Sequence, residues 1–410
     1  MSSPAYGRRC RRSPPASRST VGNAIPSRPR MAAHIVIDAR RVRDFGIGTY
    51  IRSLVQALGA IDRTNHYTLV SGPADVRAVE GLPENFSSAV YVRSDHSTLD
   101  HVAFPIFLKG LSPDLVHVPL NRVPLFMIKP YVVTIHDLAN IFFEQETSNL
   151  RMQLRRYRFR RGLVRANRVI AVSEATKRDV EAQMGVPSSR ITRVYNAPDP
   201  AFFNRAAEPG GQEQQLILER YQINYPFLLY AGNIRRHKNI PRLVEAFAVV
   251  RDQLAHHPVY KDLRLVIIGD TISQYPSVRQ AVIKSRVENV VRFLGFVPFE
   301  TLRCFYESAA GFVFPSRYEG FGLPPLEAMA CGTPVVTSNV SSLPEVVGDA
   351  AIQVNPENVF DIARGISDML LDEELRARLI RRGREQAARF SWNWTARQVL
   401  EIYKDVIGQS

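Results

Sequence analysis

The chain has 410 residues, of which 45% are apolar, and this length suits a soluble globular protein with two domains of ordinary size. No apolar run approaches the roughly 18 to 20 residues that span a bilayer, and the three cysteines form no C-x-x-C pair, which excludes a disulfide framework and a cysteine-based zinc site. So few cysteines fit a reducing cytosol, and we expect a cytoplasmic protein. The net charge is +14, and the basic stretches that contribute to it leave open a peripheral contact with the inner face of the membrane.

The first basic stretch is residues 1–30, which contain seven arginines and no acidic residue. Its serines and prolines and its lack of apolar periodicity predict a disordered extension ahead of Met31. A secretory signal would need an apolar segment that this stretch lacks. An organelle-targeting or nucleic-acid-binding tail is the alternative interpretation.

Residues 31–200 alternate short apolar strands with amphipathic helices, which predicts an α/β domain with a parallel sheet covered by helices. Gly46 and Gly48 follow the first strand and precede a helix, although a lone Gly-x-Gly is weak evidence for a phosphate site. His136 and Asp137 end the fifth strand, where a histidine is more often structural than functional. The expected strands are His34 to Asp38, Tyr67 to Val70, Val90 to Val92, Leu115 to Val118, Tyr131 to Ile135, Val169 to Val172 and Ile191 to Val194.

The second basic stretch runs from Arg151 to Arg168, where eight of eighteen residues are arginine and none is acidic. Leu150, Leu154, Tyr157 and Val164 recur at near-helical spacing, which predicts a helix with one apolar stripe. One interpretation is a solvated helix that covers a face of the sheet. The other is a surface drawn to anionic lipid headgroups or to an anionic acceptor. Nucleic acid is disfavoured, because the stretch lacks the aromatic and glycine pattern of known modules.

Prolines, glycines and polar residues interrupt the pattern from Ala197 to Asn224, and we place the boundary between the two domains there. The strand–helix alternation then restarts, which predicts a second Rossmann-like domain over residues 201–390 and a final helical segment over 391–410. We expect Trp392 and Trp394 to serve packing. The strands expected in this half are Phe227 to Tyr230, Leu263 to Ile268, Val290 to Leu294, Gly311 to Phe314, Pro334 to Thr337 and Ala351 to Val354.

The strongest chemical signal is the segment from Phe314 to Ala330. A strand ends at Phe314, and the glycines that follow, among them Gly322, let the backbone turn tightly and approach a ligand. Two prolines suit the first turn of the next helix, whose free N–H groups then form an anion site. Glu319 and Glu327 flank this turn. Because a phosphate would repel these carboxylates, we expect them to face the hydroxyls of a ribose or a sugar. The structural alternative is that both glutamates cap a helix or pair with arginines.

The segment from Tyr230 to Asn239 combines a strand end, the turn residue Gly232 and three neighbouring cations. Cations that face a diphosphate as its bond breaks lower the barrier to transfer. Three cations in a loop are more often solvated surface, but their position after a strand of the second sheet favours the functional interpretation. The cations are Arg235, Arg236 and Lys238.

The Glu-x7-Glu spacing of Glu319 and Glu327 resembles the signature of retaining glycosyltransferases of the GT-B architecture, and the run that continues through Val336 resembles glycosyltransferase family 4. This resemblance implies that Glu319 lies against the donor sugar and that Glu327 binds the ribose. It places the backbone of Phe321, Gly322 and Leu323 on donor sugar and phosphate. It also implies an Arg–Lys pair on the diphosphate: Lys238 matches the lysine, and Arg236, with Arg235 close behind, is our choice for the arginine.

In the first half, the resemblance implies that the Gly46–Gly48 loop closes over the donor phosphates, and that His136 contacts the donor sugar or backs the reacting carbon. We expect Asp137 to orient His136. Val297 lies in a segment whose backbone pairs with the nucleobase in the family. Because that recognition uses the main chain, the base cannot be read from the side chains.

We therefore expect a retaining glycosyltransferase that moves a hexose, with mannose as a guess, from a GDP- or UDP-linked donor to a hydroxyl of a glycan or lipid-linked acceptor. No D-x-D motif follows a strand, so we expect neither a metal nor a cofactor. From the pattern of the basic stretches, we also expect no nucleic acid partner. The alternatives are another GT-B enzyme, such as a sugar-nucleotide epimerase or a phosphorylase, and a non-catalytic basic binding protein.

Overall fold

The computed structural model describes residues 32–44, 46–75, 81–93, 97–143, 150–203, 211–270 and 272–408, except for the side chains of residue 140 and residues 150–152. The extension predicted for residues 1–30 lies outside these ranges. Within them, no helix combines the length and the apolar character needed to cross a membrane.

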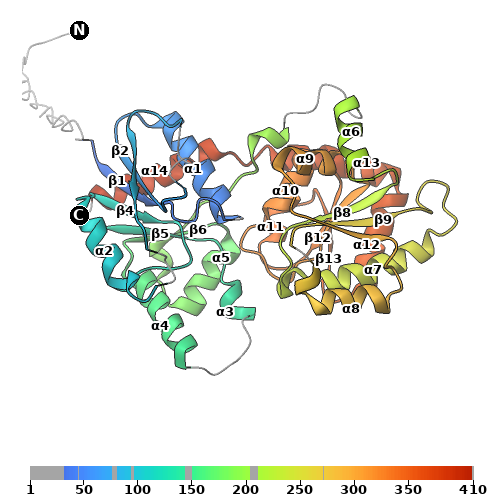
Figure 1. The fold of residues 1–410 in the computed structure, drawn as a ribbon, viewed down its shortest axis with the longest axis horizontal. Coiled ribbons are helices and arrows are strands. Elements are labelled where there is room, and N and C mark those ends of the chain that lie inside the picture. Colours follow the sequence, from blue (N-terminus) through green and yellow to red (C-terminus); the bar gives the residue numbers. More distant parts are fainter. Residues whose placement is uncertain are drawn as a thin grey trace, which may run out of the picture. The chain divides into compact units, whose positions relative to one another are not determined.

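The first sheet has seven parallel strands in the order β3-β2-β1-β4-β5-β6-β7 (Figure 1). Its central strands are Val/Ile-rich and buried, as expected for a parallel sheet with both faces covered. The strands are β1 (His34–Asp38), β2 (His66–Ser71), β3 (Phe86–Val90), β4 (Leu115–Val118), β5 (Tyr131–Ile135), β6 (Arg168–Ala171) and β7 (Ile191–Arg193). The helices are α1 (Ile47–Ile61), α2 (Asp100–Gly110), α3 (Ala139–Phe143), α4 (Leu150–Arg165), α5 (Glu174–Asp179), the short π-helix η2 (Val180–Met184) and the 3₁₀ helix η3 (Ser188–Arg190).

The second sheet has six parallel strands in the order β10-β9-β8-β11-β12-β13. The strands are β8 (Phe227–Ala231), β9 (Arg264–Ile268), β10 (Val291–Gly295), β11 (Gly311–Phe314), β12 (Val335–Ser338) and β13 (Ile352–Val354). The helices are α6 (Gln212–Arg220), α7 (Ile240–Gln253), α8 (Pro276–Lys284), α9 (Phe299–Ser308), α10 (Leu323–Ala330), α11 (Leu343–Val347), α12 (Val359–Leu371) and α13 (Glu373–Ala387). The last helix, α14 (Trp392–Gly408), packs against α1 of the first half. Three further 3₁₀ turns are η4 (Pro200–Phe203), η5 (Arg236–Lys238) and η6 (Ile272–Gln274). The prediction of two parallel α/β halves is confirmed.

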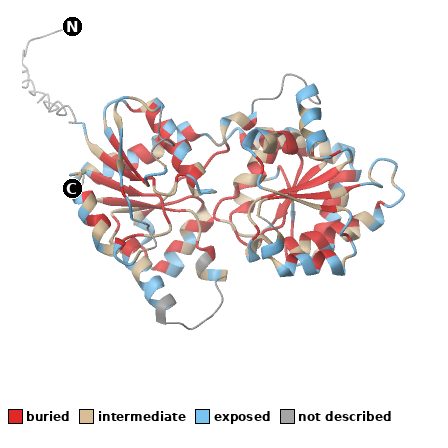
Figure 2. Ribbon diagram, viewed as in Figure 1, coloured by how far each residue is buried: buried red, intermediate tan, exposed pale blue. Residues whose placement is uncertain are grey.

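Each sheet has its own apolar core, and Figure 2 shows buried residues concentrated along the strands and on the inner faces of the helices. The last helix, α14, contributes to the core of the first sheet: Trp392 and Tyr403 are buried there. The expectation of packing is confirmed for Trp392, but it is wrong for Trp394, whose side chain is 59% exposed.

Two predictions of secondary structure also differ from the structure. The third strand is Phe86–Val90 and not Val90 to Val92, since Val92 is 77% exposed. The stretch between the domains also contains a helix, α6, that was not expected there. No residue of α6 is buried, so the stretch lacks the apolar signal that marks the other helices.

Candidate active site

The two motifs of the second half follow neighbouring strands. β8 and β11 pair in parallel with Leu228 opposite Gly311, and the strand order reverses between them. Since the carboxyl ends of parallel strands meet at one edge, the loop that carries Lys238 lies beside the loop that carries Glu319. In open α/β sheets, this reversal point is where ligands bind.

Lys238 and Glu319 form a direct ion pair at this edge. The Nζ of Lys238 donates to both carboxylate oxygens of Glu319, at 2.6 and 2.8 Å. Their side chains are only 13% and 10% exposed, and the ammonium also lies 5.2 Å from the centre of the Phe314 ring. Charge-assisted hydrogen bonds of this length are among the stronger ones in proteins. The pair therefore joins two residues that the sequence predicted separately.

Two serines hold the backbone at Glu319. The hydroxyl of Ser341 donates to the carbonyl of Glu319 at 2.7 Å and accepts from its N–H at 3.2 Å. The hydroxyl of Ser342 donates to the carbonyls of Glu319 and Phe321, at 2.9 and 2.7 Å. Sequence analysis missed both serines, because they lie after β12 and carry no motif of their own.

The glycine turn leads directly into α10. Gly322 has φ 107° and precedes the first residue of the helix, and a Cβ at this position would lie 2.8 Å from the side chain of Leu343. Pro324 and Pro325 occupy the first turn, as predicted, where their missing N–H groups are tolerated. The N–H groups that remain at the N-terminus of α10 are those of Gly322 and Leu323, and the helix end adds a partial positive charge close to Glu319.

Glu327 lies further along α10 and accepts a hydrogen bond from the hydroxyl of Tyr306 at 3.0 Å. Burial raises the pKa of Glu327 to about 7, although the Tyr306 hydroxyl acts in the opposite direction; the charge of Asp199 adds to the rise. Glu327 is therefore close to half-ionised at neutral pH. Hydrogen-bond donors from a ligand, such as a diol, would favour its charged form.

The three cations after β8 differ in exposure. Arg235 and Arg236 are exposed, whereas Lys238 is largely buried against Glu319. Burial, and then the charge of Lys238, lower the pKa of the neighbouring His237 to about 4. The structure therefore assigns Lys238 a fixed position, and the choice between Arg235 and Arg236 as the diphosphate ligand stays open.

Asn239 fixes the end of this cationic turn, and sequence analysis assigned it no role. Its backbone is left-handed, with φ 61°, a conformation in which asparagine is several-fold enriched among non-glycine residues. Its buried side-chain amide donates to the carbonyls of Pro315 and Pro356, at 3.1 and 2.7 Å. Asn239 therefore ties the turn after β8 to the segment after β11.

Gly232 and Val297 lie in loops of the same edge, after β8 and β10, and the loop that carries Gly269 after β9 lies between them. Gly232 has φ 149°, and a Cβ at Gly269 would lie 1.9 Å from its carbonyl oxygen, so these two loops pack backbone to backbone. Val297 is buried, 4% exposed, and belongs to the second core. The predicted contacts of Gly232 and Val297 with donor and base stay predictions.

His136 is partly buried at the carboxyl end of β5. Burial lowers its pKa to about 4, and its Nε2 lies 3.2 Å from the carbonyl oxygen of Pro119, so Nε2 carries the proton and donates to that carbonyl. Its ring packs edge-on against Tyr50, at 4.8 Å between ring centres. The carboxylate of Asp137 accepts from the N–H of Ala139 at 2.9 Å. The expectation that Asp137 orients His136 is wrong, since Pro119 and Tyr50 hold the ring.

The loop that carries Glu319 also contacts the first half of the chain. A Cβ at Gly320 would lie 1.5 Å from the carbonyl oxygen of His136, so only glycine permits this approach. The hydroxyl of Thr176 donates to the carbonyl of Gly320 at 3.0 Å. The hydroxyl of Tyr318 donates to Asp179 at 2.8 Å and accepts from the N–H of Leu138 at 3.2 Å. These contacts bring His136 next to the Glu319 segment.

The Gly46–Gly48 loop has a packing function that the structure shows directly. Gly46 has φ 71° and precedes the first residue of α1. Gly48 is buried in the first turn of α1, where a Cβ would lie 2.4 Å from the carbonyl oxygen of Val42. The predicted contact of Gly46 and Gly48 with donor phosphates stays a prediction.

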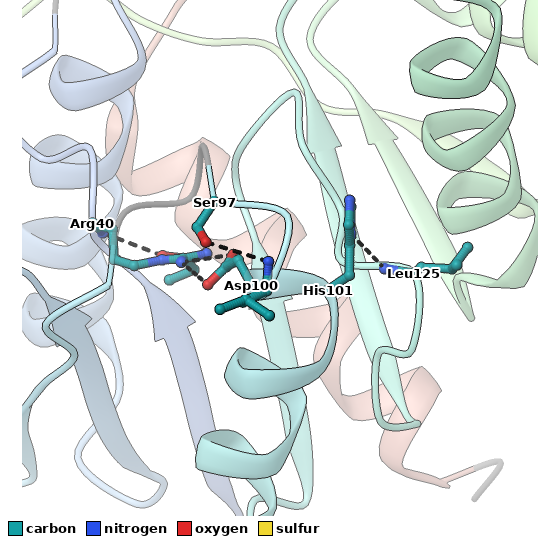
Figure 3. A network of polar contacts seen from close by, with 7 residues as sticks. Arg40, Ser97, Asp100, His101 and Leu125 are labelled. Atoms are coloured by element: carbon teal, nitrogen blue, oxygen red, sulfur yellow. Dashed lines mark hydrogen bonds and ion pairs between the residues drawn. The ribbon is translucent and has the colours of Figure 1, made fainter. Parts of the chain in front are cut away.

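A buried ion-pair network holds the loop after β1 (Figure 3). No sequence motif predicted this network. The guanidinium of Arg40 lies 2.7 Å from the carboxylate of Asp38 and 3.0 Å from that of Asp100, and it stacks 3.7 Å from the ring centre of Phe104. Burial lowers the pKa of Arg40, but the two carboxylates outweigh this effect and raise it overall. Arg40 thus anchors the loop before α1 to the start of α2.

Within the described ranges, no group of three His, Cys, Asp or Glu side chains is placed to hold a metal ion.

Two family models match the chain, one over most of the first sheet and the other over the second sheet. The model described as Glycosyltransferase Family 4 matches residues 46–202, which include His136. The model described as Glycosyl transferases group 1 matches residues 215–386, which include Lys238, Glu319 and Glu327.

Similar proteins agree with these matches. The chain is 33% identical over 381 residues to O-antigen chain mannosyltransferase B of Escherichia coli, and the match covers 88% of this chain and 96% of that protein. A glycosyltransferase of Rickettsia africae ESF-5 has a TM-score of 0.71 at 18% identity, over 92% of this chain and 100% of that one. Anabaena HepE, solved with UDP and glucose, has a TM-score of 0.70 at 18% identity, over 91% of this chain and 100% of that one.

Proposed function

Because the chain belongs to the family 4 glycosyltransferases and has their GT-B fold, we propose that it transfers a mannosyl group from a nucleoside diphosphate mannose to a hydroxyl of a glycan or lipid-linked saccharide. The likeness to O-antigen chain mannosyltransferase B supports mannose as the sugar. Our first candidate for the nucleotide is GDP. The fold neighbour that was solved with UDP and glucose makes a UDP-hexose the alternative donor.

The observation that carries this proposal is the Lys238–Glu319 pair beside the N-terminus of α10. In the proposed complex, Lys238 and one of the two exposed arginines face the diphosphate, and the N–H groups of Phe321, Gly322 and Leu323 bind phosphate and sugar oxygens. As the glycosidic bond breaks, negative charge builds on the departing diphosphate. Fixed cations and N–H groups stabilise that charge without reorganisation at the moment of reaction.

Donor binding then changes the partner of Lys238. In the structure both oxygens of Glu319 accept from the ammonium of Lys238. When the diphosphate takes up the ammonium, the carboxylate of Glu319 becomes available to the hydroxyls of the sugar. We assign Glu327 to the ribose, because Tyr306 occupies one of its oxygens and the other is left for a diol. The backbone at Val297 faces the base in this proposal.

We further propose that the anomeric configuration is retained, as the family resemblance implies. In this mechanism the leaving phosphate accepts the proton of the acceptor hydroxyl, while the anomeric carbon passes through an oxocarbenium-like state. Glu319 stabilises the positive charge and does not attack. His136 fits this assignment, because burial lowers its pKa to about 4 and so makes it a weak base at neutral pH. We therefore assign His136 to back the sugar and not to take the proton of the acceptor.

The first experiment combines a donor screen with product stereochemistry. Thermal shift with GDP-, UDP-, ADP- and dTDP-sugars identifies the donor, and proton NMR of the transferred sugar reports its configuration before the anomers equilibrate. We expect stabilisation by GDP-mannose, an α-linked product and an unchanged rate in EDTA. An inverted product would refute the retaining mechanism, and stabilisation by UDP-sugars alone would refute the GDP assignment.

The diphosphate arginine is identified by comparing Arg235→Ala with Arg236→Ala. Both side chains are exposed, so neither substitution should disturb the fold. We expect the larger loss of kcat/KM from Arg236→Ala. Equal and negligible losses would leave Lys238 and the helix N-terminus as the only groups on the leaving diphosphate.

A further inference from the structure

Exposed arginines and apolar side chains share the outer face of α4. The helix Leu150–Arg165 contains seven arginines and no acidic residue. Two of its large apolar side chains are nonetheless in solvent: Leu154 is 43% exposed and Tyr157 is 56% exposed. A hollow of about 440 Å³ is lined by Tyr157, Arg160, Arg161, Val164 and Arg165. α4 therefore presents a cationic surface with apolar side chains embedded in it.

The neighbouring helix α2 exposes an apolar stripe. Leu99, which precedes the first residue of α2, is 62% exposed, and Val102 and Ile106 are 49% and 66% exposed. Their spacing of three and four residues places them on one side of the helix. Phe104 and Leu108 are buried on the other side. The solvent side of α2 is thus more apolar than the usual surface helix.

The segment between β4 and β5 joins the two helices into one surface. A Cβ at Gly162 of α4 would lie 2.7 Å from the side chain of Val123. Two residues further on, the N–H of Leu125 donates to His101 of α2 at 3.2 Å (Figure 3). The next residue, Phe126, is 54% exposed. Figure 1 shows α2 and α4 next to each other beside the first sheet.

We propose that this surface, the α2–α4 face, docks on an anionic lipid bilayer. Its residues are Leu99, Val102, Ile106, Phe126, Leu154, Arg156, Tyr157, Arg160, Arg161 and Arg165. Arginines complement phospholipid headgroups, and the apolar side chains enter the boundary between headgroups and acyl chains, with tyrosine suited to that depth. A nucleic acid would use the guanidinium groups but would leave the apolar stripe of α2 in water. The combination of both features favours the bilayer.

Docking on a bilayer is a property separate from glycosyl transfer, and it is tested without donor or acceptor. The full chain is sedimented with vesicles of phosphatidylcholine alone and of phosphatidylcholine mixed with phosphatidylglycerol. We expect binding only to the mixed vesicles, and weaker binding as salt rises. Each arginine near an anionic surface contributes about fivefold in partitioning, so Arg156→Gln, Arg161→Gln and Arg165→Gln together should weaken binding on the order of 100-fold.

A matched control removes the same charge elsewhere. Arg378, Arg381 and Arg389 are exposed at or next to α13, and their triple glutamine variant should bind mixed vesicles like the unaltered protein. Equal losses in the two triple variants would show that net charge alone is responsible and would overturn the proposal. Melting temperatures verify that both variants fold.

The apolar stripe has its own variant, Val102→Ser, Ile106→Ser and Phe126→Ser. Since these side chains are already exposed, the fold should tolerate the changes, and we expect loss of the vesicle binding that persists at high salt. Failure of the unaltered protein to bind mixed vesicles would overturn the proposal. So would an α4 triple variant that loses single-stranded RNA binding but keeps vesicle binding. Neither result would bear on glycosyl transfer, which is assayed separately with a short water-soluble acceptor.

Discussion

The proposed contact between Glu327 and the donor ribose predicts that donor affinity depends on pH, and the pKa of Glu327 gives that dependence a defined sign. Burial raises this pKa to about 7, so the carboxyl is mostly protonated at pH 6 and mostly ionised at pH 8. Ribose hydroxyls donate hydrogen bonds, and the ionised carboxylate is the form that accepts them. Donor binding should therefore strengthen as pH rises through 7 and level off above about 8.

The expected size follows from the fraction of ionised Glu327. With a pKa of about 7, the apparent Kd at pH 6 should be about tenfold weaker than at pH 8. His136 and His237, whose pKa values are lowered to about 4, stay neutral across this range. An intact nucleotide sugar has no terminal phosphate that titrates there. Glu327 is thus the group expected to dominate the profile.

Isothermal titration calorimetry at pH 6, 7 and 8 measures the apparent Kd of the donor. Buffers with different ionisation enthalpies show in addition how many protons are released on binding. At pH 7 we expect roughly half a proton to be released on binding. Glu327→Gln should bind more weakly at pH 8 and show a flat profile. Tyr306→Phe removes a hydroxyl that lowers the Glu327 pKa, so its midpoint should move to higher pH. A flat profile for the unaltered protein, or a sloping one for Glu327→Gln, would refute the ribose assignment.

Three substitutions test the rest of the site. Lys238→Ala should reduce kcat/KM by roughly 30- to 4000-fold, corresponding to about 2–5 kcal/mol for a stranded desolvated charge, and a loss below about threefold would remove this lysine from the leaving-group role. Gly320→Ala should abolish most activity, because the added Cβ would lie 1.5 Å from the carbonyl oxygen of His136; Gly110→Ala, whose Cβ meets nothing within 4 Å, is the matched control and should be silent in the same rate assay. Tyr318→Phe should lower the free energy of unfolding in urea by about 1–3 kcal/mol, since the half-buried carboxylate of Asp179 and a buried backbone N–H lose a partner. An unchanged midpoint would show that water replaces the hydroxyl without loss.

The sheets were predictable because their strands are short, β-branched and buried on both sides, which leaves a strong local pattern. β1, β4 and β5 begin and end where the sequence predicts. The bounds of the edge strand β3 were not predicted, because its Phe86–Val90 sequence is half-exposed and contains two serines. α6 was missed for a related reason: it buries no residue, and apolar periodicity therefore could not reveal it.

For the site, local motifs indicated which residues matter but not how they are held. Lys238 and Glu319 were both chosen from the sequence, yet their pairing spans 81 residues and arises only because β8 and β11 are neighbours. Ser341 and Asn239 were missed, because each acts through contacts with distant backbone carbonyls that no spacing rule encodes. Long-range partners of this kind depend on the order of strands in the sheet.

The position of α14 affects how the polypeptide matures during synthesis. Trp392 and Tyr403 complete the core of the first sheet, although they are translated after the whole second sheet. Tyr403 also shares a hydrogen bond of 2.6 Å with the buried ring of His117 on β4. We therefore expect the amino-terminal half to complete its core only after the ribosome has made residues 392–408, with part of that core exposed to water until then. Chaperone dependence during translation should accordingly be greatest for the half that is made first.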